Sequence, residues 1–219
     1  MRGIAFCRPG EAVPDDFPLW LERFEVGTVM WNVHHGDEAV FVLEGAVDVD
    51  GHGCPAGGAV IVEAGVPATL TAPVDASIVR MGTHDISARV GRRVHVVGPG
   101  GTWAKVDAER TTRYFADSGC ATCDVTLFVT GRVHEHVSAP HSHSADELIH
   151  VLEGEIVVGR RHLGPGSTIA IAAGQRYGFR SEGFSFLNFR AHAATLTRDH
   201  VEIAEGPLAH GFEPIMDVR

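Results

Sequence analysis

The chain has 219 residues, 44% of them hydrophobic, and a formal net charge of -10 from 28 acidic and 18 basic side chains. The acidic balance argues against a nucleic-acid partner, because proteins that bind a phosphate backbone concentrate positive charge on one face. No run approaches the ~18 to 20 apolar residues of a membrane span, and the chain begins without the apolar core of a signal peptide. We therefore expect a globular, cytoplasmic protein with neither a nucleic-acid nor a membrane partner.

Short apolar runs rich in Val, Ile, Phe and Thr recur along the chain. In chain order the expected strands are "AVFVLEG", "AVDVD", "AVIVEAG", "ATLTA", "SIVRMG", "VTLFVTG", "LIHVLEG", "EIVVG", "TIAIAAG" and "FSFLNFRA". Such runs, separated by many of the 26 Gly and 11 Pro, are typical of all-β sandwiches and barrels. The one short stretch with some helical periodicity is Pro18 to Phe24. The predicted fold class is all-β.

An internal repeat divides the chain into two similar halves. The sequence "DEAVFVLEGAVDV" from Asp37 realigns on "DELIHVLEGEIVV" from Asp146 with an offset of 109 residues. The turn glycines coincide as well: Gly45 with Gly154, Gly57 with Gly166, and Gly65 with Gly174. A constant offset means that the same turns join the same strands twice. We predict two tandem β-barrels, residues 1–105 and residues 106–219.

The four cysteines are too few and too scattered to form a disulfide scaffold, which suits a reducing compartment. Cys120 and Cys123 form a Cys-x-x-Cys pair in "SGCATCDV". A redox pair usually lies at a helix N-terminus, whereas the run that follows here predicts a strand. No second such pair and no histidines at zinc-finger spacing accompany it. The sequence therefore favours two small buried residues before a strand.

The stretch "PHSHSADELIHVLEG" carries the clearest chemistry. Strand alternation places His141 and His143 on one face, and Glu147 begins the next strand beside them. Two imidazoles and a carboxylate form the 2-His-1-carboxylate set that binds a divalent transition metal and leaves positions open for substrate or dioxygen. We expect Fe or Mn first, with Ni, Zn or Cu as alternatives. His150 has the opposite parity and is not expected to be a ligand.

These residues resemble the first motif of the cupin superfamily, G(X)5HXH(X)3,4E(X)6G, with Glu135 in place of its leading glycine. The second motif, G(X)5PXG(X)2H(X)3N, falls on "GSTIAIAAGQRYGFRS". There Ala172 replaces the usual proline, Tyr177 replaces a fourth metal-ligand histidine and Ser181 replaces the asparagine. The resemblance implies a bicupin of two jelly-roll barrels, with its metal site in the C-terminal one.

In the first copy, the positions of the four motif residues hold different side chains. Asn32 aligns with His141, His34 with His143, Glu38 with Glu147 and Ala68 with Tyr177. Only a histidine and a glutamate keep ligand chemistry, and two ligands rarely hold a first-row metal against water. We predict that the first barrel is metal-free.

Tyr177 and Arg190 are the candidate catalytic residues. Tyr177 could coordinate the metal as a phenolate, act as general acid or base near it, or fill the pocket with its hydroxyl on a backbone partner. Arg190 shares strand parity with Asn188. If that face looks into the barrel, Arg190 could receive a substrate carboxylate.

The function expected first is that of a metal-dependent, dioxygenase-type oxidoreductase acting on a small organic molecule. A lyase or isomerase in the same site and a non-catalytic cupin that binds a metal or small molecule are the alternatives. The expected partner is a small-molecule substrate. Because the polar C-terminal tail could pack on a neighbouring subunit, a homodimer is a further expectation.

Overall fold

The structure is a computed structural model of the whole chain. It describes residues 3–25, 27–73, 75–86, 91–100, 103–106, 108–117, 120, 122–191, 194–199, 201–204 and 213–214. Every regular element within these residues is a β-strand, so the predicted all-β fold class is confirmed. None of the described residues forms a helix long and apolar enough to cross a membrane.

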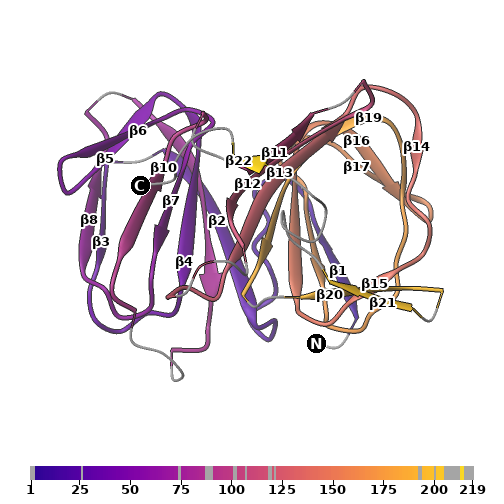
Figure 1. Cartoon of the computed structure of the whole chain (residues 1–219), viewed down its shortest axis with the longest axis horizontal. Coiled ribbons are helices and arrows are strands. Elements are labelled where there is room, and N and C mark those ends of the chain that lie inside the picture. Colours follow the sequence, from indigo (N-terminus) through magenta and orange to yellow (C-terminus); the bar gives the residue numbers. More distant parts are fainter. Residues whose placement is uncertain are drawn as a thin grey trace.

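The first barrel is built from two sheets (Figure 1). Its strands are β2 (Leu19–Glu25), β3 (Thr28–Trp31), β4 (Glu38–Glu44), β5 (Ala46–Val49), β6 (His52–Pro55), β7 (Ala59–Val62), β8 (Ala68–Thr71), β9 (Ser77–Thr83) and β10 (Val94–Val97). One sheet has the order β10-β7-β4-β9-β2, and the other has the order β3-β8-β5-β6.

The second barrel repeats this plan with additional strands. Its longer elements are β12 (Arg110–Ala116), β13 (Thr126–Arg132), β16 (Glu147–Val158), β18 (Thr168–Ile171) and β19 (Arg180–Arg190). Its shorter ones are β1 (Ile4–Cys7), β11 (Trp103–Val106), β14 (His136–Val137), β15 (Ser142–His143), β17 (Arg161–Leu163), β20 (Thr195–Arg198), β21 (Val201–Ala204) and β22 (Glu213–Pro214). The large sheet has the order β1-β18-β16-β19-β13-β12-β11-β22, with β14 on β19 and β17 on β16, while β15-β20-β21 form a smaller sheet.

Strand exchange links the two barrels. Although β1 precedes the first barrel in sequence, it pairs with β18 of the second, where Ile4 lies opposite Ile171. In return, β10 follows β9, the last strand equivalent to one of the second repeat, and pairs back onto β7, where Val94 lies opposite Val62. The strands β1 and β10, the two exchanged arms, thus cover the equivalent edge of each repeat in the same register. An edge left uncovered would expose unpaired backbone N–H and C=O groups.

Strand pairing crosses the predicted division at residues 105 and 106. The strand β1 belongs to the sheet of the second barrel, and β11, which begins at Trp103, pairs with β12 in that same sheet. Sequence periodicity identifies a strand but does not show which open edge it will cover, so the repeat could not reveal this crossing.

The described residues form three hydrophobic cores. One fills the first barrel and includes Val40 and Ile78, and a second fills the other barrel and includes Ile149 and Phe186. The third joins the outer faces of the barrels. It includes Ala39, Phe41, Ile61, Met81, Leu127, Leu148, Leu187 and Phe189. Along the central strands, residues of one parity pack into the barrel interior and residues of the other parity pack into the interface between the barrels. Both faces of the central sheets are therefore buried.

The stretch Pro18 to Phe24, predicted to have some helical character, is instead part of a strand. Residues Leu19–Glu25 form β2, which pairs along its whole length with β9. The helical prediction was wrong because pairing with an available strand outweighs a weak local preference.

Gly45 and Gly154, one of the three pairs of turn glycines that coincide in the repeat, have equivalent backbone conformations. Gly45 and Gly154 adopt φ values of 72° and 69°, in the left-handed region that favours glycine. A Cβ at either position would also collide with a backbone carbonyl oxygen, that of Asp75 or of Gly183. The same tight turn therefore joins the central strands of both barrels.

Candidate metal centre

The three predicted ligands lie inside the second barrel. His143 belongs to β15, Glu147 begins β16, and His141 forms a bridge in which the backbones of His141 and Tyr177 exchange hydrogen bonds of 2.8 and 2.9 Å. His141 and His143 are each 6% exposed and Glu147 is 1% exposed. The imidazole centroids lie 5.0 Å apart, so the two rings are brought together as strand alternation predicts.

His150 lies on the opposite face of β16. It is buried, and its Nδ1 lies 2.9 Å from the hydroxyl of Thr168. Burial, with a smaller contribution from the charge of Arg23 on β2, lowers its pKa to about 4. The neutral ring is therefore part of the packing beside the first barrel and is separated from the predicted ligands, as its parity predicts.

Glu147 is the centre of the buried polar network. Its Oε2 accepts a hydrogen bond of 2.7 Å from the hydroxyl of Tyr177. Its Oε1 accepts hydrogen bonds from Asn188 and, at 2.8 Å, from Arg190. Burial opposes the charge, but the Arg190 guanidinium, His143 and these hydrogen bonds lower the pKa of Glu147 to about 2. The carboxylate is ionised throughout the physiological range.

The imidazole of His141 is oriented by the backbone. Its Nδ1 lies 2.8 Å from the carbonyl oxygen of Ala139, which makes Nδ1 the protonated nitrogen and leaves Nε2 as the free electron-pair donor. Burial lowers the pKa of His141, and the neighbouring His143 acts in the same direction. A neutral ring held in one tautomer by a second group is the form in which histidine binds a metal.

Tyr177 belongs to the same network. Its ring centroid lies 4.5 Å from that of His141, and its hydroxyl donates to Glu147. The side chain is 7% exposed. This placement brings the phenol to the ligand set, where it can hold or transfer a proton.

Arg190 and Asn188 both face the barrel interior, which decides the parity that the sequence left open. They lie on β19, opposite Glu147 and Ile149 of β16. Arg190 is 3% exposed, and its Nη2 lies 3.3 Å from Nε2 of His143 as well as 2.8 Å from Glu147. No role was predicted for Asn188, although its shared strand parity with Arg190 was a signal for one.

The donor chemistry of this site fits a divalent metal. Two imidazoles and one carboxylate are available, and Oδ1 of Asn188 is a buried acceptor without a hydrogen-bond partner. A metal-bound water could satisfy that atom.

The position of Arg190 restricts this fit. Nη2 of Arg190 lies 2.8 Å from Oε1 of Glu147 and 3.3 Å from Nε2 of His143. A metal bound to these two residues at about 2.0–2.2 Å would need the space that this guanidinium fills. Among the described residues, the only group of at least three such side chains whose ligand atoms all lie within 4.8 Å of one another is found elsewhere, around Glu63. For the triad to hold a metal, Arg190 would have to give up its contact with Glu147.

The corresponding region of the first barrel has a different arrangement. Asn32 and His34 are exposed, and the side chain of Asn32 accepts a hydrogen bond from the backbone of His34. Glu38 is buried and accepts hydrogen bonds of 2.6 Å from Trp31 and 2.8 Å from Arg80. Two of the four aligned positions thus face away from the barrel interior.

Comparison with known proteins defines the fold. Neither a protein-family model nor a curated protein matches the sequence. Among solved structures, a glyoxylate-induced protein from Pseudomonas aeruginosa superposes with a TM-score of 0.64 at 13% identity, over 86% of this chain and 80% of that one. Oxalate decarboxylase from Bacillus subtilis superposes with a TM-score of 0.61 at 12% identity, over 88% of this chain and 74% of that one.

A cupin 2 conserved barrel domain protein from Leptotrichia buccalis also superposes, with a TM-score of 0.53 at 13% identity over 86% of this chain and 88% of that one. The superpositions span both barrels, because each covers more than four fifths of the chain. The chain therefore has the bicupin fold, two tandem jelly-roll barrels, as the sequence motifs predicted.

Proposed function

We propose that the protein is a metal-dependent enzyme whose second barrel acts on a small organic acid. The observation that carries this proposal is the convergence of His141, His143, Glu147 and Arg190 in the buried interior of one barrel. The first three are ligands for one divalent transition metal. Fe or Mn is expected first, and the likeness to oxalate decarboxylase, whose structures include Mn(II) centres, supports Mn.

Each side chain has a defined part in this proposal. A bound metal supplies Lewis acidity and open positions for substrate or dioxygen. Arg190 exchanges its contact with Glu147 for a substrate carboxylate, so that one buried cation serves both states. Tyr177 holds a proton on its hydroxyl, 2.7 Å from Glu147, and can deliver it to the substrate as a general acid; the phenolate left by that transfer can accept a proton back.

Two reaction classes suit this set of residues. The first is dioxygenase-type oxidative cleavage, in which the substrate and dioxygen occupy neighbouring positions. The second is a lyase-type reaction without net oxygen consumption, such as a decarboxylation, and the structural likeness to oxalate decarboxylase favours it. Both need the same ligands, the same arginine and the same proton carrier.

Elemental analysis of anaerobically purified protein tests the proposal, with Fe and Mn measured separately from Zn. We expect about one Fe or Mn per chain, lost in His141→Ala and retained in Tyr177→Phe. His134→Ala is the matched control because His134 is an exposed histidine close in sequence.

Reconstituted protein is then offered a panel of small carboxylic acids. Oxygen uptake identifies the dioxygenase, and substrate loss without uptake identifies the lyase. If reconstitution adds no metal beyond the amount that the His141→Ala variant also binds, the enzyme proposal is wrong and a non-catalytic binding protein replaces it.

A further inference from the structure

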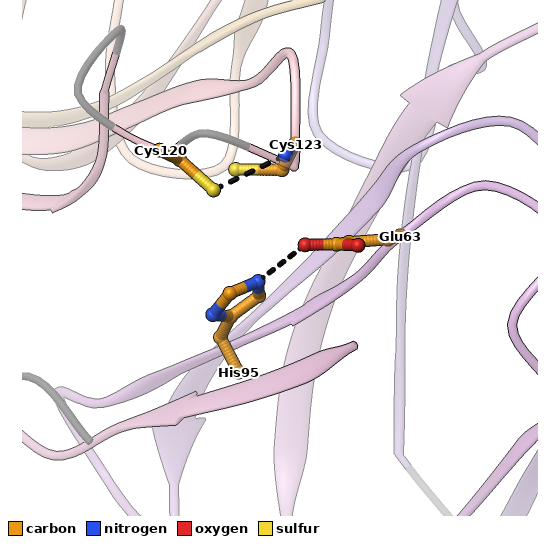
Figure 2. A group of neighbouring side chains, drawn as sticks. All are labelled: Glu63, His95, Cys120 and Cys123. Atoms are coloured by element: carbon orange, nitrogen blue, oxygen red, sulfur yellow. Dashed lines mark hydrogen bonds and ion pairs between the residues drawn. The ribbon is translucent and has the colours of Figure 1, made fainter. Parts of the chain in front are cut away.

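A second group of metal-ligand side chains lies between the barrels, away from the proposed active site. This interface cluster consists of Glu63, His95, Cys120 and Cys123 (Figure 2). The two cysteines are the Cys-x-x-Cys pair, which the sequence alone predicted to be small buried residues before a strand. The fold adds a carboxylate and an imidazole to them.

The ligands come from three separate parts of the chain. Glu63 directly follows β7, and His95 lies on the exchanged strand β10, next to β7. The cysteines lie between β12 and β13 of the second barrel. Figure 2 shows the thiols on one side of a shared space and the carboxylate and imidazole on the other. The cluster therefore joins side chains of both barrels.

The distances suit a small tetrahedral ion. All four ligand atoms lie within 4.8 Å of one another. A tetrahedral zinc site with Zn–S of about 2.3 Å and Zn–N or Zn–O of about 2.0 Å places its ligand atoms roughly 3.3–3.8 Å apart. Binding needs only a small contraction around the ion and a widening of the His95 Nε2 to Glu63 Oε1 distance, now 2.7 Å.

Hydrogen bonds from the surrounding chain orient the ligands. The backbone N–H of Cys123 donates to Sγ of Cys120 at 3.1 Å. Oε2 of Glu63 accepts hydrogen bonds from the backbone N–H groups of Arg92 and Arg93, at 2.6 and 3.1 Å, while Oε1 faces His95. Such supporting bonds to the ligands are a regular part of protein metal sites.

We propose that the interface cluster binds one Zn²⁺ and so fastens the two barrels together. Two thiolates favour Zn²⁺ over Mg²⁺, Ca²⁺ or Mn²⁺, and an imidazole and a carboxylate complete four ligands. Four protein ligands leave no open position, so the role is structural. A dithiol that cycles through a disulfide is the competing function of a Cys-x-x-Cys pair, but it has no use for Glu63 and His95 beside the sulfurs.

Cobalt binding to the full chain tests the proposal, because Co²⁺ reports both sulfur ligation and tetrahedral geometry. We expect one equivalent of Co²⁺ to give the sulfur-to-cobalt charge-transfer band and strong visible bands, and Zn²⁺ to abolish both. The bands are lost in a Cys120→Ser/Cys123→Ser variant. They remain in Cys54→Ala, which removes a buried thiol outside the cluster, and in His141→Ala, which separates this site from the proposed active site.

Thermal unfolding provides a second readout. Zinc at a hundredfold excess over its Kd is expected to raise Tm by roughly 5–10 °C, and the shift should vanish in the double cysteine variant. The proposal is overturned if the unmodified protein gives no cobalt–sulfur band, or if it is isolated without zinc and with a disulfide between Cys120 and Cys123.

Discussion

The two barrels bury a glutamate at the same place and neutralise it in different ways. In the first barrel, Glu38 is paired with Arg80, whose guanidinium also lies 5.1 and 5.2 Å from the rings of Trp20 and Trp31. In the second barrel, Glu147 is surrounded by groups that can ligate a metal, carry a proton or bind an anion. One scaffold therefore supports an ion pair in one copy and a candidate metal site in the other.

The difference depends on two positions of one strand. Glu38 lies opposite Gly82 and Glu147 lies opposite Arg190, so Gly82 is the counterpart of Arg190 and Arg80 that of Asn188. A Cβ at Gly82 would lie 2.7 Å from the Trp20 ring and 2.8 Å from the Glu38 side chain. The first barrel thus has no room for a side chain where the second carries its arginine.

The largest effect is expected from removing the buried charge of either glutamate. Glu147→Gln should lower metal affinity more than a hundredfold, because losing only a supporting partner already costs about 10–100-fold. It should also destabilise the fold by about 3–5 kcal/mol, since Arg190 would keep an unpaired buried charge. Glu38→Gln should lower stability and leave metal content unchanged. Elemental analysis and urea unfolding measure both, and equal metal loss in the two variants would remove the distinction between the barrels.

The outer faces differ as well, because His150 stands where the first copy has Phe41. The unfolded chain protonates this histidine near its usual pKa of about 6.5, whereas the folded chain does so only near a pKa of about 4. Lowering the pH between these values therefore favours the unfolded chain, by ~2–3 kcal/mol between pH 7 and pH 4.5.

The non-titrating His150→Gln variant should lose that part of the acid sensitivity. Urea unfolding at both pH values measures the effect, and His52→Gln, at an exposed histidine, is the control. An unchanged pH dependence in His150→Gln would contradict the burial argument.

Arg190→Gln removes the arginine for which the first barrel has no room. We expect a rise of about 10–100-fold in KM for an acid substrate, the equivalent of one charge-assisted hydrogen-bonding contact. Metal affinity should rise at the same time, because a competing cation leaves Glu147. Steady-state kinetics and metal titration separate these effects. A variant that loses metal would show that Arg190 supports the ligands and does not compete with the ion.

The smallest effect is expected from Tyr177→Phe, which removes only the hydroxyl at a position where the first barrel has Ala68. The loss of one hydrogen bond to Glu147 should cost about 1 kcal/mol of stability and leave the metal bound. Turnover should fall with little change in KM, as for a proton carrier. Loss of the metal itself would instead identify Tyr177 as a ligand.

Much of the fold follows from the sequence because both of its signals are local. The repeat and the positions of its turn glycines indicated two barrels, and strand alternation placed His141 with His143 and separated His150 from them. Each inference needs only the neighbours along one strand.

The features that the sequence did not show depend on contacts between distant segments. The face of Arg190 could not be decided because β19 follows β9 with an offset of 108 residues, one less than elsewhere in the repeat. The interface cluster was missed because Glu63 and His95 have no spacing signature relative to the cysteine pair. They meet it only through strand exchange and barrel packing.

The exchanged arms, β1 and β10, link the two repeats as exchanged strands link the subunits of a domain-swapped dimer. Across the large sheet, Ile4 lies next to Ile171, Ile171 next to Glu147, and Glu147 next to Arg190. A single strand therefore separates β1 from Glu147, the buried carboxylate of the second barrel. Cutting the chain between β9 and β10 would leave β1 on the first fragment and β10 on the second, each apart from the strand with which it pairs, so the two fragments should recover a native fold only by complementing one another.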